Sequence, residues 1–106
     1  MSDSPRRTPT RYCELDGFIF RLASAHITII EIKLSHTADA WWQMRRLYQP
    51  ALEKMFPPSI WAYSALEIVR WYDPRVAFPE PIRLVGSPDE LRPNEFGVHI
   101  WKPKRR

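Results

Sequence analysis

Two residues near the start of the chain have the types and spacing for phosphodiester chemistry. Glu31 and Lys33 stand two positions apart in the segment ITIIEIKL, residues 27–34, whose other members are mostly apolar. Residues two apart on a strand project from the same face, so we expect this carboxylate and this amine to lie side by side and partly buried. Taken alone, the pattern favours a simple ion pair, because buried charges are usually paired.

Asp16 adds a second carboxylate. It belongs to the segment YCELDGFIFRL, residues 12–22, which should pair antiparallel with residues 27–34 and can bring Asp16 opposite Glu31. Two carboxylates close together disfavour ionisation unless a cation joins them, and hard divalent ions bind through carboxylate oxygens. Such an ion can polarise a phosphate and acidify a water, while Lys33 holds or deprotonates the attacking water and stabilises the transition state.

Asp16 also has a purely structural interpretation. Asp-Gly is a favoured two-residue hairpin turn, so Asp16-Gly17 could merely join residues 12–15 to residues 18–22. Spacing alone leaves the two interpretations equally weighted.

The elements around these residues follow from periodicity. Residues 12–22 and 27–34 are rich in β-branched and aromatic types and flank a short polar turn, residues 23–26, which predicts an antiparallel strand pair. A helix should follow, because apolar residues recur every three or four positions up to Pro57-Pro58. Its N-cap candidates are Ser35, Thr37 and Asp39, and we expect Pro50 to kink or briefly interrupt it.

The second half of the chain should complete the sheet. Residues 60–71 are long, apolar and strand-like, and a helical crossover would return them beside residues 27–34. Prolines then divide the chain into short pieces, with edge strands expected at residues 82–85 and 98–101 and a helical turn at residues 88–91. The predicted fold class is α/β, a mixed β-sheet of about four strands with a flanking helix.

The sequence leaves open the roles of two further polar residues. Glu67, in the segment 60–71, is either an additional acidic group or half of a strand-edge ion pair with an arginine. His36 follows the strand at residues 27–34 and is more typical of a solvated or capping neighbour of a helix N-terminus than of a metal ligand. We therefore assign no histidine ligand.

The order of these residues resembles the PD-(D/E)XK phosphodiesterase superfamily of restriction-endonuclease-like nucleases. The signature of that family is an Asp opening one strand, E-x-K on the next and then a helix, which corresponds here to Leu15-Asp16-Gly17, to Glu31-Ile32-Lys33 and to the helix from Thr37. Gln43 and Tyr48 in WWQMRRLY are similar to the Q-x(3,4)-Y element of the helicase-associated branch. The resemblance covers about residues 12–72.

The resemblance implies a site and a cofactor. Asp16 and Glu31, helped by the Ile32 carbonyl, would bind Mg²⁺ or Mn²⁺; Lys33 would be catalytic, and Gln43 and Tyr48 would order the site or the nucleic acid. Proline is usual in the family where Leu15 stands here. The family's first helix and first strand would be lacking or reduced, because only a short Arg/Pro-rich arm precedes Tyr12.

The basic ends of the chain fit nucleic-acid contact and plain solubility equally well, so charge alone does not decide between them. The 106-residue chain has a formal net charge of +4. We expect a flexible basic arm at residues 1–11, a nuclease-like domain at residues 12–101 and a basic tail at residues 102–106. Arg11, Arg45 and Arg46 are the candidate phosphate contacts, although an exposed helix face usually carries arginines anyway. A lone Cys13 and the lack of a long apolar run predict a cytoplasmic protein with no membrane partner.

Together these features predict a magnesium-dependent nuclease acting on DNA, an endonuclease as first choice. The alternative is a non-catalytic nucleic-acid-binding or assembly module on a degenerate nuclease scaffold. An enzyme that works only as a homodimer or within a larger nucleic-acid-processing complex lies between the two.

Overall fold

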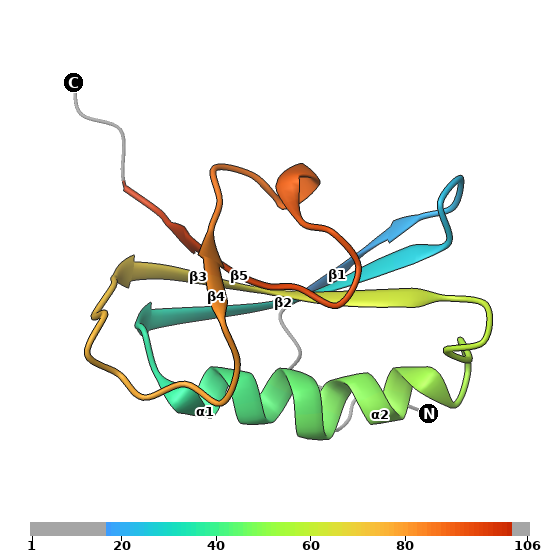
Figure 1. Ribbon diagram of the computed structural model, residues 1–106, viewed down its shortest axis with the longest axis horizontal. Coiled ribbons are helices and arrows are strands. Elements are labelled where there is room, and N and C mark those ends of the chain that lie inside the picture. The colour runs from blue at the N-terminus through green and yellow to red at the C-terminus, as the bar shows by residue number, and fades with distance from the viewer. Residues whose placement is uncertain (1–16, 103–106) are drawn as a thin grey trace, which may run out of the picture.

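One mixed sheet organises the chain in a computed structural model that describes residues 17–102 (Figure 1). Its five strands are β1 (Gly17–Arg21), β2 (His26–Ser35), β3 (Ala62–Trp71), β4 (Ile82–Leu84) and β5 (Phe96–Ile100), arranged in the order β1-β2-β3-β5-β4. The basic arm, Arg11, Cys13 and Asp16 lie outside the described residues, as does the basic tail beyond Lys102.

The strand pairings confirm the expected hairpin and crossover. β1 and β2 pair antiparallel, whereas β2 pairs parallel with β3, which the helix between them allows. The mixed α/β sheet is confirmed, with five strands where about four were expected, because residues 82–84 and 96–100 both join it and pair in parallel with each other. β5 is also not an edge strand, since it has β3 on one side and β4 on the other.

A single helical run connects β2 to β3. It consists of α1 (Ala38–Trp41), the π-helical segment η3 (Trp42–Tyr48) and α2 (Gln49–Glu53). Thr37 is the N-cap, because its side chain accepts a hydrogen bond from the backbone N–H of Asp39 at 3.2 Å. The expected interruption at Pro50 is not seen: α2 follows the π-helical segment η3 directly, and the run continues through this residue. No helix in residues 17–102 is long and apolar enough to cross a membrane.

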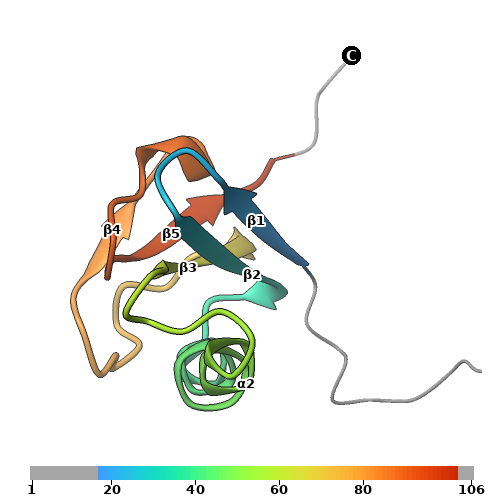
Figure 2. The same cartoon turned by 90° about the vertical axis from the view of Figure 1, so that its right-hand side faces the viewer.

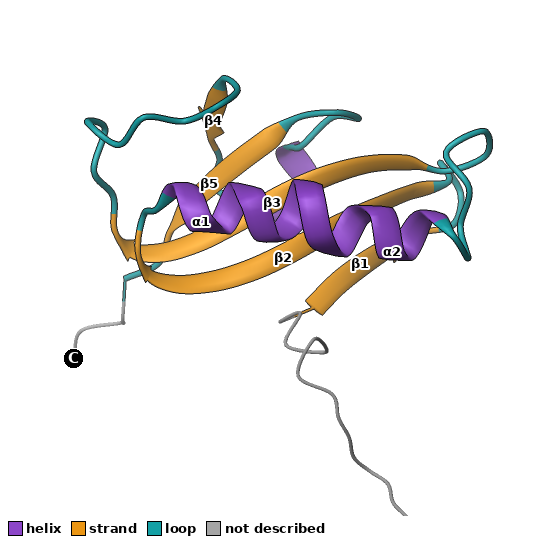
Figure 3. Ribbon diagram, turned by 90° about the horizontal axis from the view of Figure 1, so that it is seen from below, coloured by secondary structure: helices purple, strands orange, loops and turns teal. Residues whose placement is uncertain are grey.

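The helix covers one face of the sheet, and Figures 2 and 3 show it lying along the strands. We call this the helix face. Alternation along β2 directs Ile27 and Ile29 to it, where they pack with Met44 of the helix and with Tyr63 and Ala65 of β3. All five side chains are buried, so this layer is the main hydrophobic core.

The opposite face, here called the open face, is covered only in part. Residues 85–95, which include the short 3₁₀ helix η4 (Pro88–Glu90), cross above it (Figure 1). Leu91 and Val85 from this segment pack on Leu66 of β3 in a second, smaller cluster. Gly97 of β5 permits the close approach, since a Cβ at this position would meet Leu91 Cδ2 at 2.6 Å. The segment therefore seals one end of the open face.

Candidate functional site

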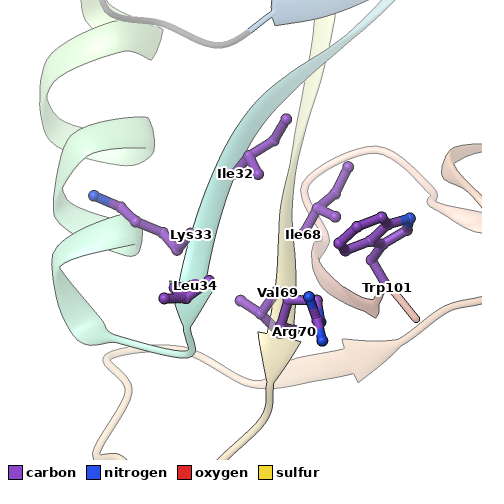
Figure 4. A pocket seen from close by; sticks show the side chains of 7 residues that line it. All are labelled: Ile32, Lys33, Leu34, Ile68, Val69, Arg70 and Trp101. Atoms are coloured by element: carbon purple, nitrogen blue, oxygen red, sulfur yellow. The ribbon is translucent and has the colours of Figure 1, made fainter. Parts of the chain in front are cut away.

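The structure brings Glu31 and Lys33 together on the helix face of β2. Both residues share the alternation of Ile27 and Ile29, and Lys33 Nζ lies 3.3 Å from Glu31 Oε2. The Glu31 side chain is 6% exposed, whereas that of Lys33 is 26% exposed, so the amine reaches solvent and the carboxylate does not. Figure 4 shows Lys33 directed toward the helix while its neighbour Ile32 lies on the other side of the strand. The expected side-by-side placement is confirmed.

A second carboxylate, from Glu67, stands beside Glu31. The parallel register of β2 and β3 pairs these two residues, and Glu67 is 0% exposed. Its Oε1 lies 2.8 Å from His36 Nδ1, and its Oε2 accepts a hydrogen bond from the Thr37 backbone N–H at 3.2 Å. Burial raises the pKa of Glu67, while these contacts and the nearby Lys33 act in the opposite direction. The suggested strand-edge pair with an arginine was wrong, because β3 is a central strand.

His36 is buried, not solvated as expected. Its ring lies 4.8 Å from that of Phe78 and 4.9 Å from that of Tyr72, so the segment after β3 closes over it. Nδ1 faces Glu67, and Nε2 has no hydrogen-bond partner among residues 17–102. With Glu67 ionised, Nδ1 carries the ring hydrogen and donates it. His36 therefore fixes the junction between β2 and the helix through β3.

Gln43 and Tyr48 both lie on η3. A π-helix joins residues five apart by a backbone hydrogen bond, so these two side chains are one turn apart. Tyr48 belongs to the helix-face core and is 7% exposed. The Oε1 atom of Gln43 is buried and makes no hydrogen bond to the described part of the chain. Tyr48 is therefore a core residue by its packing, whereas Gln43 carries a buried acceptor oxygen.

Asp16, with its two interpretations as a metal ligand and as part of a hairpin turn, lies outside the described residues. Gly17, the first residue that the structure describes, opens β1 and pairs with Ile30 of β2.

Only some of the expected metal ligands lie within the described residues. Among residues 17–102, no three His, Cys, Asp or Glu side chains form a group that could hold a metal ion. Glu31 and the Ile32 carbonyl offer the hard oxygen atoms that magnesium and manganese bind, so they fit the expected ion in donor type. The remaining expected ligand, Asp16, lies before Gly17.

The three arginines expected at the nucleic acid differ in their surroundings. Arg45 is held inside the protein: Nε and Nη2 reach the two carboxylate oxygens of Glu80 at 2.9 and 3.0 Å, and Nη2 also donates to the Asn94 carbonyl at 3.1 Å. Its guanidinium thus joins the helix to the segments around β4. Arg46 is exposed, with its guanidinium 5.8 Å from the Trp41 ring. Arg11 lies outside the described residues.

A separate polar cluster lies on the open face at the end that residues 85–95 cover, where Arg21 Nη2 also lies 3.3 Å from Asp89 Oδ1 of η4. Ser64 Oγ is 2.8 Å from both His26 Nε2 and Thr28 Oγ1, and Arg21 Nη1 donates to Thr28 Oγ1 at 2.8 Å. Burial, followed by the charge of Arg21, lowers the pKa of His26. Because Ser64 is 0% exposed, its hydroxyl cannot meet a substrate, and the cluster is structural.

The helix-face site thus combines a shielded carboxylate, an amine with access to solvent and a second buried acid locked to a histidine. Such a set can orient an ammonium toward an anion while its acid stays in place. Comparison of the chain with protein-family models, with curated proteins and with solved structures found no match.

Proposed function

We propose that this chain is a metal-dependent nuclease of the PD-(D/E)XK type, hydrolysing phosphodiester bonds in DNA as an endonuclease. Its restriction-endonuclease-like core would consist of β1, β2, the helical run and β3. The observation that carries the proposal is the Glu31–Lys33 pair, which places a 6% exposed carboxylate 3.3 Å from an amine that reaches solvent. Charged groups in such surroundings are costly to keep and are often functional.

The register of β1 and β2 supports a role for Asp16. Gly17 pairs with Ile30, so the residue before Gly17 is next in line to face Glu31. Residues directly opposite on antiparallel strands share a face, which would put the Asp16 carboxylate on the helix face beside that of Glu31. The site would then hold two acids and one amine.

Asp16, Glu31 and the Ile32 carbonyl would hold Mg²⁺ or Mn²⁺ through oxygen atoms. When bound, the ion would neutralise charge on the phosphate and lower the pKa of a coordinated water. Lys33 would hold the attacking water and stabilise the negative charge that develops on the phosphate oxygens. Glu31 would keep the Lys33 ammonium aimed at that position, and Gln43 and Tyr48 would order the helix wall of the site.

Cleavage assays test this proposal. Full-length protein would be incubated with plasmid and with single-stranded DNA in magnesium, in manganese and in chelator. We expect metal-dependent cutting that falls by about a hundredfold or more in Lys33→Ala, Glu31→Gln and Asp16→Asn, because each removes a group needed in the transition state. Lys54→Ala, at an exposed lysine after α2, is the matched control and should cut normally. Undiminished cutting by Lys33→Ala, or no cutting by the wild type with either metal, would refute the proposal.

A non-catalytic nucleic-acid-binding or assembly module is the second candidate. The observation favouring it is that Lys33 already neutralises Glu31 at 3.3 Å, which is what a purely structural ion pair would do. This candidate predicts DNA binding that survives both Lys33→Ala and Asp16→Asn, with no cutting by the wild type in any metal.

A further inference from the structure

An open pocket of about 450 Å³ lies over the C-terminal ends of β2 and β3 (Figure 4). Its apolar lining comes from Ile32, Leu34 and Ile68, and its other walls from Lys33, Arg70 and Trp101. Ile32 and Trp101 lie on the side of β2 away from the helix, as Figure 4 shows. The pocket is therefore separate from the Glu31–Lys33 pair, although Lys33 contributes to both.

The pocket is bare because residues 85–95 cover only the other end of the open face. Ile32 is 58% exposed, Leu34 is 71% exposed and Trp101 is 48% exposed. Large apolar side chains that are exposed together around one hollow mark a binding surface more often than isolated ones do.

Trp101 and Arg70 are held in place at the rim. The Trp101 backbone N–H donates to the Val69 carbonyl at 2.7 Å, which fixes this tryptophan beside β3. The Arg70 guanidinium lies 5.2 Å from the Trp101 ring and 5.6 Å from the Trp71 ring. No carboxylate forms an ion pair with Arg70 within residues 17–102, so its charge can serve an incoming anion.

Charge selects the occupant. Arg70 supplies a cation at the rim of the pocket, and no carboxylate residue lines it. Four further basic residues, Lys102, Lys104, Arg105 and Arg106, follow Trp101 in the sequence, and the whole chain carries a net charge of +4. A partner that is flat and apolar on one side and anionic on the other suits both the indole and the cations. An unpaired nucleobase with its phosphate has these properties, whereas the faces of the bases in a duplex are covered by the neighbouring base pairs.

We propose that this pocket seats an unpaired base of single-stranded nucleic acid, with the base against Trp101 and the apolar floor and its phosphate at Arg70. The proposal rests on the proposed function and deepens it by naming the form of the substrate. Lys33 belongs to the stretch of β2 that lines the pocket, while its amine is directed toward the helix on the other side of the strand (Figure 4).

Binding in chelator separates this proposal from catalysis. The full chain would be titrated against fluorescein-labelled oligothymidylate and against the corresponding duplex, with fluorescence anisotropy as the readout. We expect the single strand to bind more tightly than the duplex, and Trp101→Ala to weaken single-strand binding by about tenfold, the usual effect of losing one stacking platform. Arg70→Gln should weaken binding and reduce its salt dependence by about one phosphate contact.

Two further variants keep the test decisive. Leu34→Gln changes the floor at a 71% exposed position, where folding should be unaffected, and we expect it to weaken binding as well. Trp42→Ala removes a tryptophan that is 55% exposed on the helix, away from the pocket, and should bind as the wild type does. Circular dichroism would establish that each variant is folded.

The outcomes are distinct. Wild-type affinity in Trp101→Ala, Arg70→Gln and Leu34→Gln, or tighter binding of the duplex, would overturn the pocket proposal even if the protein cuts DNA. A dimer in sedimentation that Trp101→Ala dissociates, with oligonucleotide affinity unchanged, would overturn it in favour of contact between two copies. Trp101-dependent binding without cutting in any metal would support the pocket while refuting the nuclease.

Discussion

Glu31 and Glu67 occupy paired positions on the parallel strands β2 and β3, and both side chains are buried on the helix face. Each acid has a partner of its own: Lys33 Nζ lies 3.3 Å from Glu31, and His36 Nδ1 lies 2.8 Å from Glu67. Separate partners make two adjacent carboxylates tolerable in an apolar layer. Glu31 thus keeps an amine that meets solvent, while Glu67 secures the junction of strand and helix.

Removing Glu67 should destabilise the fold. Glu67→Ala leaves His36 Nδ1 and the Thr37 backbone N–H without their acceptor, and we expect the free energy of unfolding to fall by about 1–3 kcal/mol in urea titrations. Glu67→Gln keeps an acceptor oxygen and should lose less. Asp89→Ala is the control, because its side chain is 89% exposed. Equal stability in Glu67→Ala and the wild type would contradict this role.

A divalent ion should stabilise the folded chain through Glu31. Because a ligand that binds only the native state raises its stability, millimolar magnesium or manganese is expected to raise the Tm of the wild type in a thermal shift assay. The rise should vanish in Glu31→Gln and Asp16→Asn and persist in Lys54→Ala. A rise of equal size in Glu31→Gln would place the ion elsewhere.

His26 should make the fold sensitive to acid. Burial and the charge of Arg21 lower its pKa in the folded chain, so the unfolded chain takes up the proton first as the pH falls below about 6.5, the ordinary histidine value. The unfolded state then binds more protons than the native state, and stability is lost as the pH drops through this range. His26→Gln should flatten the dependence of the unfolding free energy between neutral pH and pH 5. An unchanged slope would contradict the prediction.

Arg45 should matter for stability more than for nucleic-acid affinity. A double-mutant cycle of Arg45→Ala and Glu80→Ala is expected to give a coupling energy of about 1–3 kcal/mol, since the partly buried pair makes two charge-assisted hydrogen bonds. Arg46→Ala, one position along the same helix but exposed, should leave the unfolding free energy almost unchanged. Additive effects of the two single changes would show that Arg45 and Glu80 are not coupled.

The parts of the fold that could be predicted are those with a strong local signal. The β-branched composition of residues 27–34, the apolar repeat of the helix and one of the three N-cap candidates, Thr37, are short-range signals, and each appears in the structure. The pairing of β4 with β5 had no such signal, because both strands are short and prolines surround them. Their order in the sheet depends on contacts made across the whole chain.

The same division applies to the candidate site. The contact between Glu31 and Lys33 follows from a spacing of two on one strand. The contact of His36 with Glu67 joins residues 31 positions apart, and it depends on the register of β2 with β3. The contact of Arg45 with Glu80 likewise joins the helix to a segment whose path no periodicity predicts. Long-range partners of charged residues therefore had to come from the structure.

Gly97 allows residues 85–95 to pack closely on the sheet. Leu91 packs directly on β5 because position 97 has no side chain. Residues 85–95 contact the sheet through this leucine and Val85. A methyl group there would push the Leu91 side chain away from β5 and disturb its packing on Leu66. A substitution at position 97 would therefore change the open face without touching Glu31 and Lys33, which lie on the helix face. Binding of nucleic acid on one face and catalysis on the other could then change independently.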